Sequence, residues 1–167
     1  MNKMIVIING SGGCGKDTVV SIFSKYKNVE NVSSIDVIRE CARMLGCNSK
    51  TEEDRLFLSN LKQLSSDFYN HPVVYMSSKI DNFILSDNDI IFLHIREPEE
   101  IKEIVNIYKD FIPTKTMLVV RDSVKHINSN KSDAEVYDFD YDITIHNDHD
   151  LKSLELKIKE IINNISI

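Results

Sequence analysis

The part of the sequence that decides the fold centres on residues 10–18, which read Gly10-Ser11-Gly12-Gly13-Cys14-Gly15-Lys16-Asp17-Thr18. The apolar run Met4–Ile8 comes before it and predicts a β-strand that is buried on both faces. The apolar spacing over residues 19–26 predicts a helix directly after it. Four of the five glycines in the chain lie between positions 10 and 15. The turn between this strand and this helix therefore has the composition of a phosphate-binding loop.

The loop carries groups that suit a polyphosphate. Glycine lets main-chain N–H groups turn inward and approach phosphate oxygens closely, and the positive end of the following helix adds to the attraction. Lys16 can reach the β- and γ-phosphates as a point charge. The alternative is a glycine-rich turn with a solvated lysine. We expect the loop to bind ATP through Gly10, Ser11, Gly12, Gly13, Cys14, Gly15, Lys16, Asp17 and Thr18.

The residue after Lys16 departs from the general pattern, in which a serine or threonine in this place binds Mg²⁺. Asp17 stands there, and Thr18 follows it. We predict a Mg²⁺ ion with Asp17 and Thr18 as candidate ligands. The alternative is that Asp17 only interacts with the positive end of its own helix. Alkylation of Cys14 is expected to block nucleotide binding, unless its thiol is an inert small side chain in the turn.

Beyond this loop, predicted strands and helices alternate, which indicates a parallel sheet covered on both faces. No linker divides the chain, so we expect one domain over residues 1–167. The helix that follows Thr51 is predicted to be capped by the hydroxyl of that residue. Its apolar residues recur at helical spacing and are predicted to be buried: Leu56, Phe57, Leu61, Leu64 and Phe68. Further strands are expected over residues 29–34, 90–95, 117–120 and 142–146, and further helices over 36–45, 72–85, 98–108 and 151–165.

Composition and charge limit the function. The net charge of −6 and a pI near 5.3 argue against a protein that binds duplex nucleic acid. The three cysteines form no metal-binding pattern and cannot all pair, so a reduced, cytoplasmic protein is the simpler interpretation. The apolar run Met4–Ile8 is too short for a signal peptide or a membrane span, and no membrane partner is expected.

Gly15-Lys16-Asp17-Thr18 resembles the same segment in the deoxynucleoside monophosphate kinases of bacteriophages. More distantly, the chain is similar to adenylate, dephospho-CoA and phosphomevalonate kinases. The resemblance implies an α/β P-loop NTPase fold of three layers, with about five parallel strands in the order 2-3-1-4-5 and helices on both faces. It also implies acceptor-binding helices over residues 36–86, a short lid over 122–136, and a monomer or homodimer. The implied activity is ATP-dependent phosphoryl transfer to a small phosphorylated acceptor, such as a nucleoside or deoxynucleoside monophosphate.

Several other segments match this resemblance in the right order. Asp36-Val37-Ile38-Arg39 is similar to an Asp-Pro-Leu-Lys segment, where the acid orients the acceptor or a metal-bound water. The alternative is that Asp36 is only a helix N-cap. Arginine suits a monophosphate because its planar fork matches phosphate geometry. We expect Arg39, Arg55 and Arg96 to bind the acceptor. Arg43 lies on the same predicted helix face as Arg39. The alternative is that these arginines are ordinary surface charges.

Residues 94–101 are similar to an Asp-x-Arg-x-Pro-x-Glu-Ile segment, but His94 replaces its aspartate. The usual metal-associated acid is therefore missing, and Asp36 or Glu97 is expected to substitute. His94 is alternatively a buried, hydrogen-bonded strand histidine. Arg96 follows this strand at the sheet edge where open α/β sheets bind ligands, so it is also a candidate catalytic residue together with Lys16 and Asp36.

The polar stretch over residues 122–136 stands where such kinases carry a lid, unless it is a surface loop. Arg121, with Lys125, His126 and Lys131, is expected to stabilise charge on the transferring phosphoryl group. Tyr141–Asp148 resembles the last strand of these kinases, after which Asn147 would lie beside the adenine. Asn147 is alternatively the cap of the final helix.

Other function classes fit less well. A GTPase is disfavoured because no Asp-x-x-Gly or Asn-Lys-x-Asp sequence occurs. A kinase of nucleic-acid 5′ ends is disfavoured because the acidic chain offers no basic groove. A nucleotide-binding sensor or a degenerate ATPase without a small acceptor remains as the alternative to a kinase.

Overall fold

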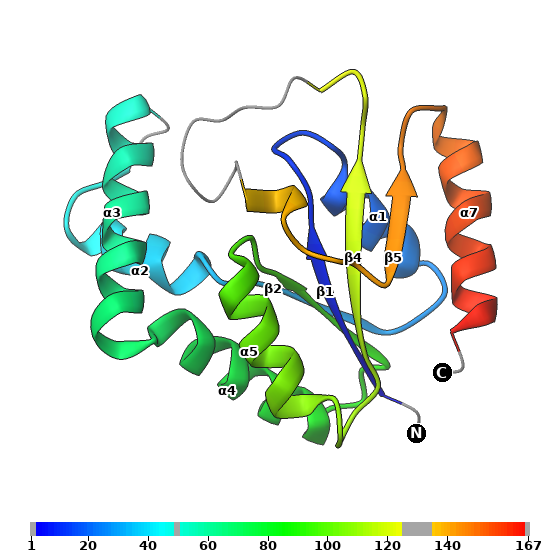
Figure 1. Cartoon of the computed structure of the whole chain (residues 1–167), viewed down its shortest axis with the longest axis horizontal. Coiled ribbons are helices and arrows are strands. Elements are labelled where there is room, and N and C mark those ends of the chain that lie inside the picture. The colour runs from blue at the N-terminus through cyan, green and yellow to red at the C-terminus, as the bar shows by residue number, and fades with distance from the viewer. Residues whose placement is uncertain (1–2, 49–50, 125–134, 166–167) are drawn as a thin grey trace.

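A computed structural model of the chain describes residues 3–48, 51–124 and 135–165. Strands and helices alternate along it, with three helices in succession between the second and the third strand (Figure 1). In chain order the elements are β1 (Met4–Asn9), α1 (Lys16–Phe23), β2 (Val29–Ser33), α2 (Asp36–Met44), α3 (Glu52–Tyr69), α4 (His71–Leu85), β3 (Ile90–His94), α5 (Pro98–Tyr108), β4 (Thr114–Val120), η1 (Glu135–Tyr137), β5 (Ile143–His146) and α7 (Leu151–Asn164).

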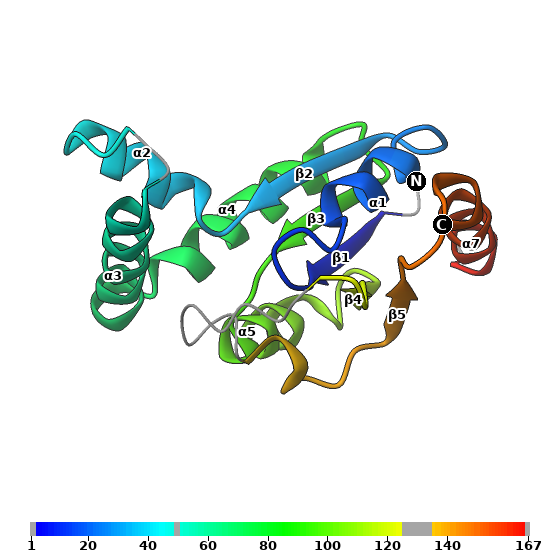
Figure 2. The ribbon, with the colours of Figure 1, turned by 90° about the horizontal axis from the view of Figure 1, so that it is seen from above.

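The strands form one parallel sheet in the order β2-β3-β1-β4-β5, which confirms the predicted fold class (Figure 2). Met4 of β1 pairs with Ile90 of β3 on one side, and Ile5 pairs with Thr114 of β4 on the other. β1 therefore lies between β3 and β4. The chain runs from β1 to β2 on one side of it, returns to β3, and then continues to β4 on the other side. A parallel sheet binds ligands at such a point, outside the carboxyl ends of its strands.

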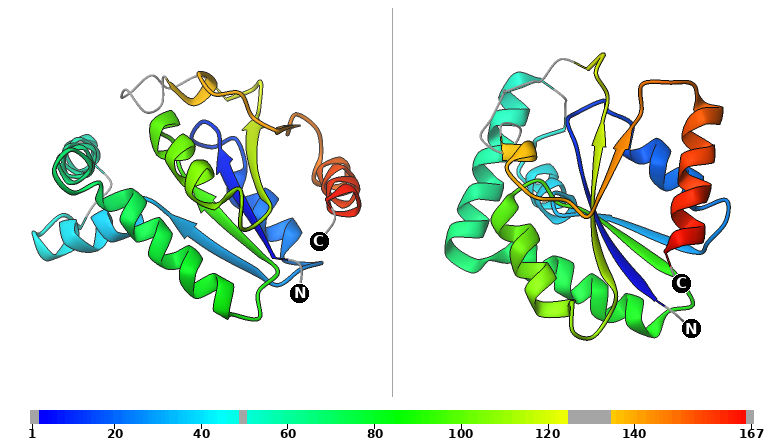
Figure 3. Two further views of the ribbon diagram at one scale, coloured as in Figure 1. Left: turned by 60° about the horizontal axis from the view of Figure 1, so that its bottom comes forward. Right: turned by 45° about the vertical axis from the view of Figure 1, so that its right-hand side comes forward.

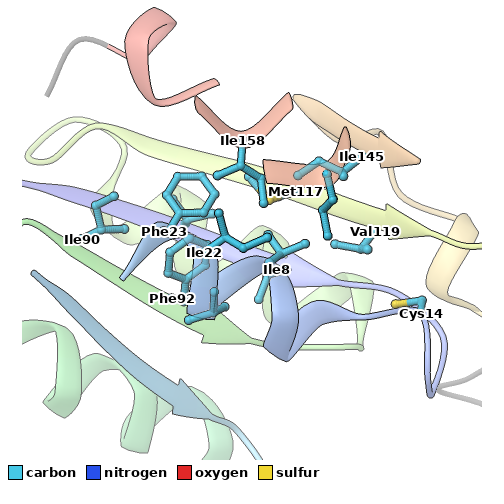
Figure 4. Packing of buried hydrophobic residues seen from close by; sticks show 14 of the residues in the cluster. Ile8, Cys14, Ile22, Phe23, Ile90, Phe92, Met117, Val119, Ile145 and Ile158 are labelled. Atoms are coloured by element: carbon cyan, nitrogen blue, oxygen red, sulfur yellow. The ribbon is translucent and has the colours of Figure 1, made fainter. Parts of the chain in front are cut away.

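Alternate residues of β1 point to opposite faces of the sheet and build two separate cores. Val6 and Ile8 belong to the first core, which α1 and α7 complete. Within it, the rings of Phe23 and Phe92 meet edge to face with centroids 5.0 Å apart (Figure 4). Ile5 and Ile7 belong to the second core, which α4 and α5 cover. The two views in Figure 3 show these two helix layers on either side of the sheet.

Helix α3 differs from its prediction. Thr51 caps it as expected, since the Thr51 hydroxyl accepts a hydrogen bond of 3.2 Å from the main-chain N–H of Asp54. The predicted burial of its apolar stripe is wrong: α3 packs against α2 and α4 rather than against the sheet, and its buried residue is Lys62. Apolar periodicity specifies a helix, but it does not say what covers the stripe. The exposed members of the predicted stripe are Leu56, Phe57, Leu64 and Phe68.

Two further features concern the chain as a whole. Within the described residues, none of the helices is both long and apolar enough to cross a lipid bilayer. The three cysteines are free thiols. Cys14 is buried and packs within the first core, whereas Cys41 is exposed.

Candidate active site

The loop after β1 has a backbone that only glycine accommodates without strain at several positions. Gly10, Gly13 and Gly15 have φ values of 146°, 83° and 101°, which lie in the region that disfavours residues with a Cβ atom. A Cβ atom on Gly10 would also lie 2.4 Å from the main-chain oxygen of Val119. Asn9 is the last residue of β1, and its Oδ1 atom accepts a hydrogen bond of 2.8 Å from the N–H of Gly10, the first residue of the loop. The glycine-rich composition thus follows from the path of the backbone.

Lys16 is the first residue of α1, and its side chain folds back over the loop. Its Nζ atom donates hydrogen bonds to the main-chain oxygens of Gly10 (2.5 Å) and Ser11 (3.0 Å). Burial lowers the pKa of Lys16; neighbouring Cys14 opposes this shift, and the Arg96 charge adds to it. A half-buried cation bonded to two carbonyl groups at a helix start is a suitable partner for an anionic ligand.

A cleft of about 800 Å³ runs from the phosphate loop to helices α2 and α3. Its lining includes most of the residues predicted for the site, from four separate parts of the chain. The phosphate loop contributes Gly12, Gly13, Lys16 and Asp17, and the other parts contribute Asp36, Arg39, Arg55, His94, Arg96 and Glu97. Arg43, four residues after Arg39 on the same helix, is exposed and does not line it.

Asp36 organises the turn between β2 and α2. Its carboxylate accepts a hydrogen bond of 2.9 Å from the main-chain N–H of Ser33 and contacts Nη1 of Arg39 at 3.3 Å. The N-cap of α2 is Ile35, and Asp36 is the first residue of the helix, so the alternative that Asp36 is the N-cap is wrong. The Asp36–Arg39 pair is partly exposed and contributes little to stability. Its effect is to hold a carboxylate and a guanidinium together at the cleft.

His94 ends β3 beside the phosphate loop, and its Nε2 atom donates a hydrogen bond of 2.8 Å to Oδ1 of Asn31 on β2. Burial lowers the pKa of His94, and the opposing charge of Asp17 only partly offsets this. The lowered pKa favours the neutral form of His94. His94 is hydrogen-bonded at the end of its strand, as the alternative expects, but its side chain is only half-buried and lines the cleft. The nearby carboxylates whose charges act on it are those of Asp17 and Asp36.

Sequence reasoning missed a buried charge cluster at the far end of the cleft. Nζ of Lys62 on α3 donates to the carboxylate of Glu97, and it lies 3.1 Å from Oε2 of Glu100 on α5. Burial raises the pKa of Glu100 to about 7; Lys62 opposes this shift and Glu97 adds to it. Glu97 is engaged by Lys62, so it is a poorer substitute for the missing acid than Asp36. The seven-residue spacing from Arg55 to Lys62 would have placed both on one helix face.

The end of β5 also contacts the phosphate loop. Nδ2 of Asn147 donates a hydrogen bond of 2.9 Å to the main-chain oxygen of Cys14. The cap of α7 is Asp150, whose carboxylate accepts from the N–H of Ser153, so the alternative that Asn147 caps this helix is wrong. Thr18 and Arg121 are exposed and do not line the cleft.

A pair of tyrosines ties the segment after the predicted lid to the phosphate loop. The hydroxyl of Tyr141 accepts a hydrogen bond of 2.7 Å from Asn9 and donates to the main-chain oxygen of Val136. Burial raises the pKa of Tyr141 to about 12, and the hydrogen bond from Asn9 works in the opposite direction. The hydroxyl of Tyr137 lies 3.2 Å from Oγ of Ser11. Residues 125–134, with the predicted lid cations Lys125, His126 and Lys131, lie outside the described residues.

Comparisons with known proteins agree with this architecture. A cytidylate kinase from Sulfurisphaera tokodaii is 29% identical over 119 residues, and the match covers 66% of this chain and 64% of the relative. Thymidylate kinase from Ehrlichia chaffeensis has a TM-score of 0.57 at 13% identity, over 98% of this chain and 99% of that one. Shikimate kinase from Aquifex aeolicus has a TM-score of 0.53 at 11% identity, over 98% and 99%. No protein-family model matches the sequence. The chain has the P-loop kinase fold.

Proposed function

We propose that the chain is an ATP-dependent phosphotransferase whose acceptor is a nucleoside or deoxynucleoside monophosphate. The observation that carries the proposal is that one cleft joins the phosphate loop to three arginines, which come from α2, from α3 and from the connection between β3 and α5. A protein that only binds ATP needs the phosphate loop. It does not need Arg39, Arg55 and Arg96 to line the part of the cleft beyond that loop. Arginine forks are suited to the phosphate of an acceptor.

The donor nucleotide would bind to the loop. Main-chain N–H groups of residues 10–18 and Nζ of Lys16 would hold the phosphates of ATP, with Asn147 near its base. Asp17 and Asp36 offer carboxylate oxygens at the cleft, which are the ligands that Mg²⁺ prefers. Thr18, the second predicted ligand, does not line the cleft. Bound Mg²⁺ would neutralise charge on the β- and γ-phosphates.

The acceptor would bind between α2, α3 and the end of β3. Arg39, Arg55 and Arg96 would hold its phosphate, so that one of its oxygens attacks the γ-phosphorus while the bond to the leaving ADP oxygen breaks. Asp36, held by Ser33 and Arg39, would orient the acceptor. Arg121, which directly precedes the proposed lid over residues 122–136, would stabilise charge on the transferring phosphoryl group within a single domain. Such a reaction needs positioning and charge stabilisation more than covalent chemistry.

The acceptor class rests on two lines of support. The relative from Sulfurisphaera tokodaii carries the name cytidylate kinase, which favours a pyrimidine nucleotide. The Gly15-Lys16-Asp17-Thr18 segment is similar to that of the bacteriophage deoxynucleoside monophosphate kinases. One observation favours a second candidate, a sensor or degenerate ATPase: the neutral His94 occupies the place of the usual acid.

The two candidates are separated by ³¹P NMR of the full chain with Mg²⁺, ATP and a panel of acceptors. The panel holds ribo- and deoxynucleoside monophosphates, dephospho-CoA, phosphomevalonate and a 5′-hydroxyl oligonucleotide. We expect ADP and a new nucleoside diphosphate signal, both absent with Lys16→Ala, whose folding is checked by circular dichroism. ADP with inorganic phosphate alone would assign a hydrolase. A new signal only with dephospho-CoA, phosphomevalonate or the oligonucleotide would keep a kinase and reject the nucleotide acceptor.

A further inference from the structure

Asn9 is the most deeply buried polar side chain among the described residues. It is the last residue of β1, it is 0% exposed, and every other residue of that strand is buried as well. Burying an amide costs free energy unless its N–H groups and its oxygen are hydrogen-bonded. The function of Asn9 therefore follows from its partners, which belong to three different segments around the candidate active site.

The amide of Asn9 uses its oxygen and both of its N–H groups. Oδ1 accepts the hydrogen bond from the N–H of Gly10, and Nδ2 donates to the main-chain oxygen of Arg96 at 3.1 Å and to the hydroxyl of Tyr141 at 2.7 Å. The opposite orientation of the amide would set its oxygen against the carbonyl oxygen of Arg96 and its N–H groups against that of Gly10. The network therefore allows one orientation, in which one side chain joins the phosphate loop to the connection between β3 and α5.

The contact with Arg96 extends the pairing of two central strands. The ladder between β1 and β3 ends at the pair Ile8–His94. Arg96 lies two residues beyond that pair, and the side chain of Asn9 holds its main-chain oxygen there. Arg96 and the phosphate loop both line the cleft. Asn9 also lies in the cleft wall, but its 0% exposure means that it acts on a ligand through these two neighbours rather than by contact.

Tyr141 fixes the plane of the Asn9 amide. Its hydroxyl takes up the second N–H of Asn9 and donates to the main-chain oxygen of Val136 at 2.8 Å. The ring of Tyr141 packs against that of Phe139, with centroids 5.0 Å apart. An amide that donates to two separate acceptors is held in one plane, so loss of the Tyr141 hydroxyl would loosen its contact with Arg96.

We propose that Asn9 is a positioning residue for phosphoryl transfer, which holds Arg96 and the phosphate loop in one fixed arrangement. The inference rests on the proposed function, in which the loop binds ATP and Arg96 binds the acceptor phosphate. Because the N–H of Gly10 and the oxygen of Arg96 bond to the same planar group, neither segment can shift alone without losing a hydrogen bond. In-line transfer depends on such placement, since a displacement of about 1 Å can lower the rate about 100-fold.

The test compares Asn9→Ser with the natural sequence in the full chain. A serine hydroxyl is neutral and too short to reach Arg96 or Tyr141. Transfer is followed with Mg²⁺, saturating ATP and each nucleoside monophosphate of the panel in turn. We expect kcat to fall about 100-fold, while the dissociation constant of ATP, measured by calorimetry, rises less than about tenfold. Tyr141→Phe removes a single hydroxyl and should lower kcat about tenfold.

Thr116→Val is the matched control for a loss of stability alone. Thr116 is another buried polar residue of the sheet, and its hydroxyl donates a hydrogen bond of 2.9 Å to the carboxylate of Asp142 rather than to the site. This variant should lower the midpoint of urea unfolding, as Asn9→Ser does, and keep the natural kcat.

An unchanged kcat in Asn9→Ser, with or without weaker ATP binding, would assign Asn9 to the fold or to the loop alone. That result would overturn the inference and leave the proposed function standing. Tyr141→Phe decides the question if Asn9→Ser fails to fold, and a natural kcat in it would overturn the inference equally. A natural chain that phosphorylates no nucleoside monophosphate would instead reject the proposed function, and this inference with it.

Discussion

Asn147 at the end of β5 holds the main-chain oxygen of Cys14 in the phosphate loop through a hydrogen bond of 2.9 Å between residues 133 positions apart. The loop conformation thus depends on a side chain from the opposite half of the sequence. Asn147 does not line the cleft, and its hydrogen bond to Cys14 positions the loop.

Asn147→Ala removes this hydrogen bond and leaves the oxygen of Cys14 without its amide donor. We expect the free energy of unfolding to fall by about 1 kcal/mol. ATP should bind several-fold more weakly, because part of the binding energy must then order the loop. Urea unfolding and isothermal titration calorimetry measure the two quantities. An unchanged ATP affinity together with lowered stability would show that Asn147 supports the fold alone.

Gly15→Ala places a Cβ atom 2.3 Å from Nδ2 of Asn147, at a residue with φ of 101°. We expect a loss of about 2–4 kcal/mol, part from backbone strain and part from the steric clash. Gly46→Ala is the matched control, since Gly46 has φ of 93° with no atom near its missing Cβ. It should lose only about 1 kcal/mol in urea unfolding. Equal losses at both positions would mean that Asn147 moves away freely.

The Lys62–Glu97–Glu100 cluster predicts a pH dependence of stability. Burial raises the pKa of Glu100 to about 7 in the folded protein, against an ordinary value of 4.5. Between these values the folded protein binds more protons than the unfolded chain. The contribution of Glu100 to the free energy of unfolding therefore falls as the pH rises from about 4.5 to about 7. Glu100→Gln cannot ionise, so it should remove this fall and stabilise the protein by about 1–3 kcal/mol at pH 8.

Urea unfolding of both proteins at a series of pH values checks this expectation. The matched control is Glu99→Gln, which changes a neighbouring carboxylate whose side chain is 86% exposed. It should leave the pH profile of the natural protein unchanged. A Glu100→Gln profile parallel to that of the natural protein would show that Glu100 ionises normally.

Two of the three arginines at the cleft, Arg39 and Arg55, make separate predictions for the acceptor. Arg39→Ala and Arg55→Ala should each raise the KM for the acceptor about 10–100-fold, since each removes a charged hydrogen-bond partner of its phosphate. The KM for ATP should change little, because the phosphate loop is untouched. Arg43→Ala removes an arginine of the same helix outside the cleft and should leave both constants unchanged. Equal effects of Arg39→Ala and Arg43→Ala on acceptor KM would contradict this assignment.

Much of the fold follows from local sequence patterns. The apolar runs at Met4–Ile8 and 90–95 predict buried strands because only a strand covered on both faces is apolar throughout. The glycines of the phosphate loop are informative for a similar reason, since a backbone with positive φ admits few other residues. These features depend on neighbouring residues alone, and the structure confirms the strands that they predict.

Features that depend on distant parts of the chain were not predictable in the same way. The apolar spacing in α3 correctly indicated a helix, but whether Phe57 and Phe68 meet the sheet or solvent depends on where α2 and α4 place that helix. The Lys62 cluster joins α3 to α5, and the Asn147 contact joins β5 to the loop. No local spacing relates these partners, so only the assembled fold reveals them.

The central claim is that one cleft holds a donor and an acceptor phosphate together, and a single linked ligand tests it. The ligand joins adenosine to cytidine or thymidine through a pentaphosphate bridge, and calorimetry measures its binding in the presence of Mg²⁺. We predict one ligand per chain and an affinity at least ~100-fold above that of ATP, because the second half binds at high effective concentration. An affinity no higher than that of ATP, unchanged by Arg39→Ala and Arg55→Ala, would contradict the account.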